Sequence, residues 1–154
     1  MEQIRFDLGL ATGPLAVSLK DGEVTAVGSA AQHPEARPAT EREQKSFRDH
    51  LLGRGAFLYP MSWAGLTAFQ RQVIEELGKV PFGQRVSYQE LARRVGRPKA
   101  ARAVGSAMAK NPYPLLYPCH RVVPSSGGIG QFSFGGPEVK AGLLTWEERQ
   151  IGDH

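Results

Sequence analysis

Apolar and polar residues alternate near the start of the chain, in the period-two pattern of β-strands. The alternation runs through residues 4–10 and returns over 15–19, before the dipeptide Asp21-Gly22. Asp-Gly readily adopts the positive φ angles of a two-residue hairpin turn, so residues 23–27 are predicted to form the returning strand. The chain is therefore expected to open with a small antiparallel sheet.

Helical spacing replaces this alternation further along the chain. A polar segment with two prolines precedes a short helix predicted over residues 41–52, and the first unit is expected to end near Pro60. Apolar residues then recur at helical spacing over 66–77, with Gly78 where a C-terminal cap belongs. A final helix is expected around residues 138–148.

Two short helices around a tight turn are predicted in the middle of the chain. A helix over residues 88–95 is indicated by the capping box Ser87-Tyr88-Gln89-Glu90. It is broken by Gly96-Arg97-Pro98, and an Ala-rich helix follows over residues 99–110. The arrangement is a helix-turn-helix candidate, although the same geometry is common packing in helical proteins.

The second of these helices has one face of small side chains. At helical spacing, four residues are expected to face the interior: Ala101, Val104, Ala107 and Met108. The opposite face carries one long cation among small residues: Ala100, Arg102, Ala103 and Ser106. A helix surface this thin can press close to a nucleic-acid backbone or groove.

Length and composition indicate a folded protein of one large or two small domains. The chain has 154 residues, of which 41% are hydrophobic and 22% charged. The order of elements predicts an α/β fold class. An N-terminal α/β domain of residues 1–60, with an antiparallel sheet plus a helix, precedes a mostly helical, winged-helix-like domain of residues 61–154. No apolar run approaches the roughly 18 residues of a membrane helix, and the first residues lack a signal-peptide pattern. A cytoplasmic protein without a membrane partner is therefore expected.

Positive charge is concentrated in the middle of the chain. Residues 79–121 contain nine Lys or Arg and one acid, Glu90, which gives this segment a charge of +8, while the rest of the chain sums to −4. A basic face attracts a polyanion, because each neutralised phosphate releases counterions. The alternative is a solvated helical surface without a specific partner.

Cys119 is the only cysteine in the sequence, so no internal disulfide can form and a thiol in a reducing compartment is predicted. Three nearby prolines exclude a regular helix around it. A nucleophilic thiol must lose its proton, and the neighbouring base is His120, although adjacent residues on an extended segment point in opposite directions. A turn or a bridging water would then be needed. An inert buried thiol is the alternative.

Further candidate groups lie after the cysteine. A base histidine needs an orienting group, and the last helix offers Glu138, Glu147 and Glu148. The Gly-rich segment 125–136 is expected to wall a small pocket, but it lacks the motifs of phosphate-binding and dinucleotide-binding loops, so nucleotide binding is not expected. Histidines 33, 50 and 154 have no metal-ligand spacing. No metal site is expected, and these histidines are predicted to be solvent-exposed.

The surroundings of the cysteine match a known pattern. The motif Pro118-Cys119-His120-Arg121-Val122 is preceded by Asn111-Pro112 and followed by Gly135-Gly136. In order and spacing, residues 66–148 resemble the O6-alkylguanine-DNA alkyltransferases. The resemblance implies a DNA-repair protein that moves the alkyl group of O6-alkylguanine in duplex DNA to its own cysteine. It would act once per molecule, as a monomer and without a cofactor, with O4-methylthymine as a second candidate substrate.

The resemblance also implies roles for individual residues. Cys119 would accept the alkyl group, His120 would act as a water-linked base, and Glu147 would orient His120. Asn111 would brace the active-site turn, and Tyr88 would help to flip the nucleotide and to deliver a proton to the departing guanine. The second helix would enter the minor groove through Lys99, Ala100, Arg102, Ala103 and Ser106, with Arg102 in the space left by the flipped nucleotide. The base pocket would be lined by Met108, Val122, Phe132 and Ser133.

Two positions depart from the family pattern. Phe132 stands where tyrosine is usual, and Phe134 is one extra residue before Gly135-Gly136. Glu147 therefore matches its family position only when that insertion is allowed. Because both departures lie in the pocket loop, the range of substrates is expected to differ from that of the family.

Three other functions stay open at this point. An alkyltransferase-like protein that recognises damage without catalysis is the nearest, but such proteins lack the acceptor that Cys119 provides here. A transcriptional regulator would carry polar readers of base edges on the second helix, which is Ala-rich in this chain. A cysteine hydrolase would turn over repeatedly, so the ratio of product to protein distinguishes it.

Overall fold

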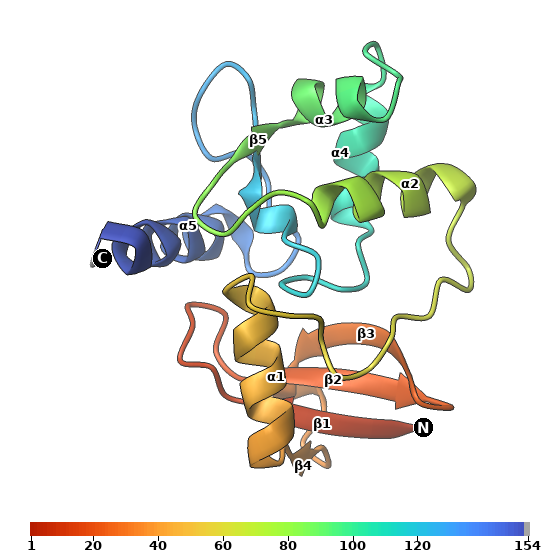
Figure 1. The fold of residues 1–154 in the computed structure, drawn as a ribbon, viewed down its shortest axis with the longest axis vertical. Helices are drawn as coiled ribbons and strands as arrows, with labels where there is room; N and C mark the ends of the chain where they lie inside the picture. Colours follow the sequence, from red (N-terminus) through yellow and green to blue (C-terminus); the bar gives the residue numbers. More distant parts are fainter. Residues whose placement is uncertain (153–154) are drawn as a thin grey trace. The chain divides into compact units, whose positions relative to one another are not determined.

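The computed structural model describes residues 1–152 and divides the chain into two units (Figure 1). The N-terminal unit comprises Met1–Ala64 together with Pro112–Leu116, and the C-terminal unit comprises Gly65–Asn111 and the chain from Tyr117 onward. The predicted division near residue 60 misses the return of Pro112–Leu116. This short segment joins the first unit because the Val27 amide donates a hydrogen bond to the Pro112 carbonyl at 2.8 Å.

The N-terminal unit is built on a four-stranded sheet in the order β3-β2-β1-β4. Its elements are β1 (Glu2–Phe6), β2 (Leu15–Lys20), β3 (Glu23–Ser29), the three-residue helix η1 (Ala30–Gln32) and β4 (Arg37–Pro38). The three longer strands are antiparallel, as predicted, whereas β4 pairs with β1 in parallel. The first strand ends at Phe6 rather than at Leu10. Strand β4 was not predicted, because a proline argues against a strand in the sequence. The strand forms here because it lies at the edge of the sheet, where proline is tolerated.

The β2–β3 hairpin turns at Asp21-Gly22, as the sequence predicts. Lys20 pairs with Glu23 across the turn, and φ is 52° at Asp21 and 79° at Gly22. Glycine adopts such positive φ angles without a steric penalty. The Asp-Gly signal therefore determines where the returning strand begins.

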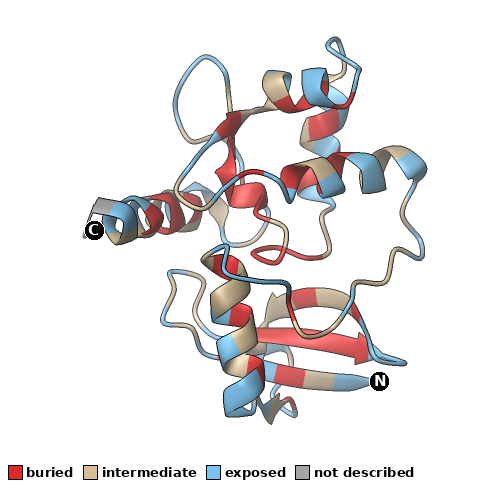
Figure 2. Cartoon of the chain, in the orientation of Figure 1, coloured by how far each residue is buried: buried red, intermediate tan, exposed pale blue. Residues whose placement is uncertain are grey.

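Helix α1 (Glu41–Leu51) packs an aromatic cluster against this sheet. A capping box at Thr40 starts the helix. The ring centres of Phe6 on β1, Phe47 on α1 and Phe57 are 5.1, 5.4 and 6.1 Å apart. With the helix in place, strand β2 is buried along almost its whole length (Figure 2).

The predicted exposure of the histidines is wrong at His50. This side chain is half-buried on α1, with one ring nitrogen 3.2 Å from the Gly55 carbonyl oxygen and the other 2.6 Å from the Leu116 carbonyl oxygen. The segment that returns from the middle of the chain supplies the second acceptor, which the local sequence does not reveal. His33 is partly exposed, and His154 lies outside the described residues.

A buried carboxylate, Glu43, joins α1 to the sheet edge. It is 3% exposed and accepts hydrogen bonds from Arg37 at 2.8 Å on both oxygens, and from the Tyr59 hydroxyl at 2.6 Å. The hydrogen bonds from Arg37 outweigh the effect of burial and lower the pKa of Glu43 to about 2. The ionised carboxylate is therefore part of the folded structure.

The N-terminal unit is expected to lose stability in acid through this group. Because the pKa of Glu43 is lowered from 4.5 to about 2, its contribution is full above pH 4.5 and disappears as the pH falls toward 2. Glu43→Gln is expected to cost on the order of 2 kcal/mol at neutral pH, since partial exposure of Arg37 lets water screen the pair. Urea unfolding at several pH values measures both effects. Glu2→Gln, which removes an exposed partner of the same arginine, is the control, and equal losses in the two variants would contradict this account.

The C-terminal unit is mostly helical. Its elements are α2 (Ala68–Leu77), β5 (Val86–Ser87), α3 (Tyr88–Arg94), α4 (Ala101–Ala109), η2 (Cys119–Arg121), β6 (Val122–Val123) and α5 (Gly136–Gly152). Together with the antiparallel sheet, they confirm the predicted α/β class. Ser87 caps α3 by accepting from the Glu90 amide at 2.9 Å, while the Glu90 carboxylate pairs with Arg93. Within residues 1–152, no helix has the length and apolar character needed to cross a membrane.

Helices α3 and α4 contact each other around a tight turn, which gives the predicted helix-turn-helix (Figure 1). Gly96, with φ of 77°, lies in the turn that follows α3. Helix α4 begins at Ala101 rather than at Lys99, because the Ala100 amide still donates to the Arg97 carbonyl within the turn, at 2.9 Å. Lys99 and Ala100 therefore precede the helix.

The two faces of α4 follow the predicted pattern with one exception. Val104, Ala107 and Met108 are buried, but Ala101 is only half-buried. On the other side, three residues are exposed and Ala100 is half-buried. The exposed three are Arg102, Ala103 and Ser106.

Candidate active site

A single 3-10 turn, η2, carries Cys119. The Arg121 amide closes the turn by donating to the Pro118 carbonyl at 2.9 Å. Before the turn, the Asn111 side-chain amide donates to the Tyr117 carbonyl at 3.1 Å. After it, β6 pairs in parallel with β5. The turn is thus held at both ends, and it is the turning backbone that the prolines indicate.

The Cys119 thiol is buried, with 6% of the residue exposed. Burial raises the pKa of the thiol, although a hydrogen bond with Asn111 and the positive charge of Lys140 oppose the rise. The thiol is therefore protonated at neutral pH. It becomes a nucleophile only if a neighbouring base removes its proton.

His120, which follows Cys119 in the sequence, is a buried base that is hydrogen-bonded through Nε2 to Glu147 on α5. Burial lowers the pKa of His120 despite the nearby carboxylate, so the ring is neutral. A neutral ring that donates from Nε2 presents a lone pair at Nδ1. The Nδ1 atom is buried and has no hydrogen-bond partner among the described residues. Of the three candidate acids, the structure brings Glu147 to this histidine.

Arg121 also belongs to this site, although its positive charge was expected on the basic surface. It is 5% exposed, and its Nε donates to both oxygens of Glu147, at 2.9 and 3.1 Å. Its Nη1 donates to the Val80 carbonyl at 2.8 Å, and the guanidinium carbon lies 5.6 Å from the centre of the Phe82 ring. Its charge is therefore directed inward and is not part of the basic surface.

Glu147 is the meeting point of these groups. It is 1% exposed, and the Gly83 amide adds a further hydrogen bond to Oε1 at 2.9 Å. Burial alone would raise the pKa of Glu147, but hydrogen bonds and charge interactions with His120 and Arg121 outweigh it and lower the pKa. The carboxylate is ionised, with Arg121 as its counter-charge.

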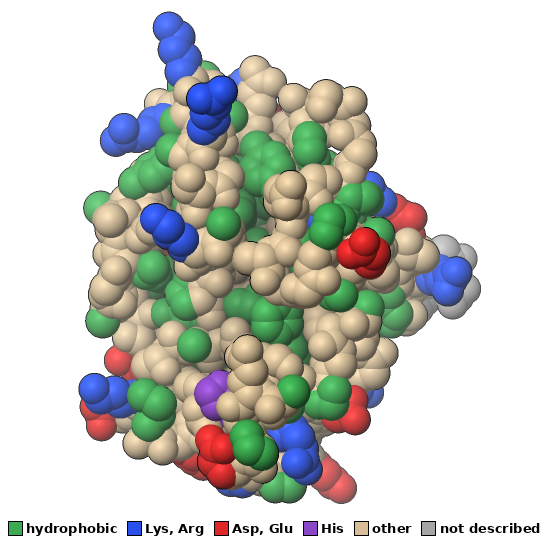
Figure 3. Space-filling view, turned by 180° about the vertical axis from the view of Figure 1, so that it is seen from behind, with side chains coloured by type: hydrophobic (Ala, Val, Ile, Leu, Met, Phe, Trp, Pro, Cys, Tyr) green, Lys and Arg blue, Asp and Glu red, His purple; other side chains and the backbone are tan. Residues whose placement is uncertain are grey.

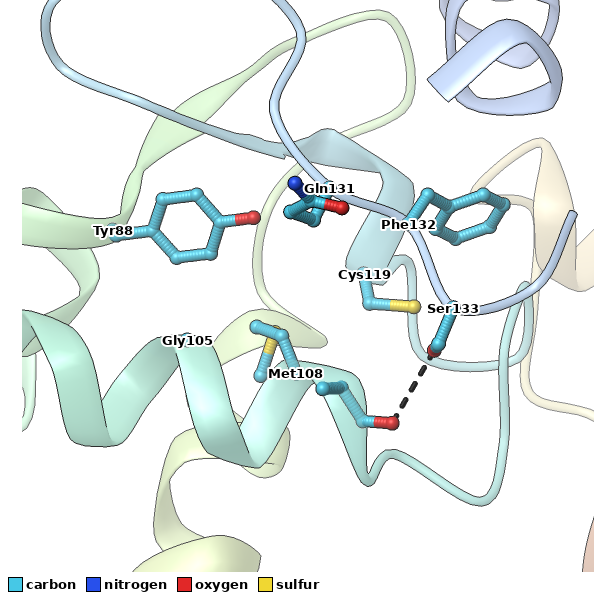
Figure 4. Close-up of a pocket in the computed structure, with 8 residues that line it drawn as sticks. Tyr88, Gly105, Met108, Cys119, Gln131, Phe132 and Ser133 are labelled. Carbon is cyan, nitrogen blue, oxygen red and sulfur yellow. Dashed lines mark hydrogen bonds between the residues drawn. The ribbon is translucent and has the colours of Figure 1, made fainter. Parts of the chain in front are cut away.

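A pocket opens beside the cysteine (Figure 4). It is lined by Tyr88, Gly105, Met108, Ala109, Cys119, Gln131, Phe132 and Ser133. The Cys119 sulfur lies between Met108 on α4 and the loop at Phe132 and Ser133, and the Tyr88 hydroxyl points toward the same space. The Gly-rich loop thus supplies one wall of the pocket.

Val122, in contrast, is not among the residues that line this pocket. Its side chain is fully buried, and its backbone pairs with Val86 between β6 and β5. Its expected role in the base pocket therefore stays a prediction that rests on the family resemblance.

Two contacts hold the pocket loop. The Ser133 hydroxyl donates to the Ala109 carbonyl at 3.3 Å, which ties the loop to the end of α4 (Figure 4). The additional residue, Phe134, packs edge-on against Phe132 with ring centres 6.4 Å apart. The insertion therefore supports the pocket wall.

Lys140 on α5 is a second residue that sequence reasoning missed. It is completely buried, and its Nζ donates to the Gln131 carbonyl at 3.0 Å and to the Tyr88 hydroxyl at 3.4 Å. Burial lowers the pKa of Lys140 and raises that of Tyr88. The sequence did carry a signal, because Lys140 and Glu147 are two helical turns apart on the apolar face of the last helix.

A wider groove adjoins the pocket, between α4 and the loop segment 124–131. Three of the five residues expected to contact DNA are in its lining: Lys99, Arg102 and Ser106. The other two, Ala100 and Ala103, are not. The pocket and the groove adjoin, because four residues line both: Tyr88, Gly105, Ala109 and Gln131.

Exposed positive charge surrounds this groove. Four of the nine cations between residues 79 and 121 are in ion pairs: Lys79, Arg85, Arg93 and Arg121. The other five are exposed and form no ion pair with described residues: Arg94, Arg97, Lys99, Arg102 and Lys110. Figure 3 shows basic side chains gathered over the part of the unit that carries α3 and α4. The local surface suits a polyanion.

Comparison with known proteins gives consistent matches. The family described as 6-O-methylguanine DNA methyltransferase, DNA binding domain, matches residues 68–149. The constitutive methylated-DNA–protein-cysteine methyltransferase of Bacillus subtilis is 37% identical over 117 residues, which is 75% of this chain and 70% of that protein. The methylated-DNA–protein-cysteine methyltransferase of Mus musculus is 59% identical over 81 residues, which is 52% of this chain and 38% of that protein. The match thus spans about two fifths of the mammalian relatives.

A solved structure extends the likeness to nearly the whole chain. The crystal structure of Mycobacterium tuberculosis OGT in complex with DNA superposes with a TM-score of 0.78 at 28% identity, and covers 97% of this chain and 94% of that one. The N-terminal unit therefore shares this fold as well, although residues 1–60 carry little of the sequence resemblance. With the family match over residues 68–149, these findings show that the chain belongs to the 6-O-methylguanine DNA methyltransferase family.

Proposed function

We propose that the protein repairs duplex DNA by moving the alkyl group of O6-alkylguanine to the sulfur of Cys119, once per molecule. The observation that carries the proposal is the pocket itself, which is lined by the only cysteine of the sequence, and the residue after this cysteine, His120, is buried and paired with Glu147. The names of the relatives support the same reaction, as does the DNA complex of the M. tuberculosis protein.

The chemistry requires one proton transfer and one bond exchange. Nδ1 of His120 takes the Cys119 proton through a water molecule, while Glu147 holds the ring at Nε2. The thiolate attacks the alkyl carbon, and the new S–C bond forms as the bond from that carbon to O6 breaks. The departing guanine takes a proton from the Tyr88 hydroxyl, which water reprotonates while His120 releases the thiol proton to solvent. The product is a stable thioether, so the protein is consumed, and the scheme balances without a cofactor.

Asn111 acts on both the backbone and the thiol. Its side chain holds the Tyr117 carbonyl just before the turn, and its hydrogen bond to Cys119 favours the thiolate. This bond offsets part of the cost of ionising a buried sulfur. Asn111 is therefore proposed as the residue that braces the active-site turn.

Helix α4 is proposed to enter the minor groove of the DNA. Its exposed face combines small side chains with Arg102, and an arginine is attracted by the concentrated negative potential of a narrow groove. Arg102 would occupy the space of the extruded nucleotide, as base flipping requires. The neighbouring contacts would be made by Lys99, Ala100, Ala103 and Ser106.

The flipped base would lie between α4 and the Gly-rich loop. Met108 and Phe132 supply apolar contacts there, and Ser133 supplies a hydroxyl. Phe132 has no hydroxyl group, so it contributes packing and stacking rather than a hydrogen bond. We also propose a cytosolic location, since a reducing compartment keeps a lone acceptor thiol reduced.

Single-turnover stoichiometry tests the proposed reaction. The protein is incubated with excess duplex DNA that carries one O6-methylguanine with a radiolabelled methyl group, and the label on the protein is followed with time. The label is expected to reach one methyl group per molecule and to stop there. Repeated turnover would indicate a hydrolase, and binding without labelling would indicate a damage-recognition protein.

A further inference from the structure

Three residues from two segments of the C-terminal unit donate hydrogen bonds to a single carboxylate. Glu147 on α5 receives Arg121 and His120 from the active-site turn, and it receives the Gly83 amide from the loop between α2 and β5. His120 and Arg121 are buried, as Glu147 is, so water screens their interactions little, while the Gly83 contact is part-buried. The position of this carboxylate is therefore defined by three donors.

Arg121 supplies the charge that balances this carboxylate. It contacts both carboxylate oxygens, and it is itself held by the Val80 carbonyl and the Phe82 ring. A buried pair of this kind is neutral overall. The carboxylate can then remain ionised while the adjacent histidine carries no charge.

The state of His120 follows from this balance. Next to an ionised and balanced carboxylate, the ring donates from Nε2 and keeps its Nδ1 lone pair. Besides Arg121, the titratable groups that act on the ring are Glu147 and Lys140. A carboxylate without its cation would instead draw a proton to the pair, and the pair would no longer accept one from the thiol.

We propose that Arg121 is a positioning residue that balances the charge of Glu147, together with the Gly83 amide, which donates to the same carboxylate oxygen. This balance keeps His120 neutral and able to accept the Cys119 proton. The inference rests on the proposed alkyl transfer for its functional meaning. The charge balance itself can be measured without any DNA substrate.

The test compares Arg121→Gln with Arg121→Lys. The first variant removes the cation, and the second keeps it while it loses the planar, two-pronged contact. Proton uptake by His120 is followed through the ¹⁵N shifts of its ring, assigned by comparison with His120→Gln. In Arg121→Gln, uptake is expected to move to higher pH by about one unit or more, as loss of a near charge does. In Arg121→Lys, the pH of proton uptake is expected to stay close to that of the unmodified protein. If Arg121 only held the site together, both variants would shift this pH.

The alkyl-transfer rate should follow the same pattern. With free O6-benzylguanine as substrate, the acidic limb of the rate profile is expected to move to higher pH in Arg121→Gln and to return in Arg121→Lys. Arg85→Gln is the matched control, since Arg85 pairs with the next glutamate, Glu148, at the exposed surface. Its profile is expected to be unchanged. Equal shifts in the Gln and Lys variants, or none in either, would overturn the proposal.

A second variant covers the case in which Arg121→Gln does not fold. Gly83 has φ of 82°, a conformation that a residue with a Cβ rarely adopts, so Gly83→Ala strains the backbone whose amide bonds to Glu147. Proton uptake by His120 is expected to move in the same direction by a smaller amount, and no movement would count against the proposal. If the histidine shifts appear but no protein form transfers an alkyl group, the charge balance stands and the proposed function fails.

Discussion

Cys119→Ala is expected to abolish alkyl transfer completely while binding to alkylated duplex DNA is retained. Cys119 is the only thiol in the sequence, and no other side chain at the pocket offers a nucleophile of comparable strength at neutral pH. The proposed DNA contacts lie on α4 and not on the active-site turn, so the variant should still bind. Quenched assays with a labelled methyl group measure transfer, and fluorescence anisotropy measures binding.

Cys119→Ser is the conservative control for this result. It keeps the size of the side chain, but a hydroxyl group is far less acidic than a thiol, and a neutral histidine such as His120 cannot generate a useful alkoxide in the same time. Transfer should be lost in both variants. Methyl transfer to the protein in Cys119→Ala would show that the acceptor is another residue.

Arg102→Ala is expected to slow repair of duplex DNA far more than reaction with free O6-benzylguanine. Only duplex DNA requires a base to be extruded and its space to be filled, and unstacking costs a few kcal/mol. Loss of the residue that fills that space is therefore expected to slow duplex repair by about 100-fold at saturating DNA. The free base needs no flipping, so its rate should change little.

Arg94→Ala separates insertion from general attraction. Arg94 is an exposed cation on α3 without an ion pair to the described residues, so its removal should weaken DNA binding by one phosphate contact. Saturating DNA should restore the rate of Arg94→Ala but not that of Arg102→Ala. Equal losses on duplex and free base in Arg102→Ala would contradict the insertion role.

Local signals account for the elements that were predicted well. Asp21-Gly22 has a backbone preference that depends on no distant residue, and the same is true of the Ser87 cap and of the break at Gly96. Their positions in the structure follow from short-range geometry. The hairpin and the helix-turn-helix could therefore be predicted from neighbouring residues alone.

Long-range contacts account for the features that were not predicted. Arg121 was counted as surface charge because its partners, Val80 and Glu147, are far from it in the sequence. His50 was assigned to the surface because one of its hydrogen-bond partners, the Leu116 carbonyl, lies 66 residues further along the chain. In each case burial depends on a partner that local patterns do not show.

The most direct test of the central claim is the intact mass of the protein after incubation with duplex DNA that contains one O6-methylguanine, followed by peptide mapping. The account predicts a single gain of about one methylene per molecule, located on Cys119, with no further gain in excess DNA. No gain despite tight binding, or a gain located on another residue, would contradict it.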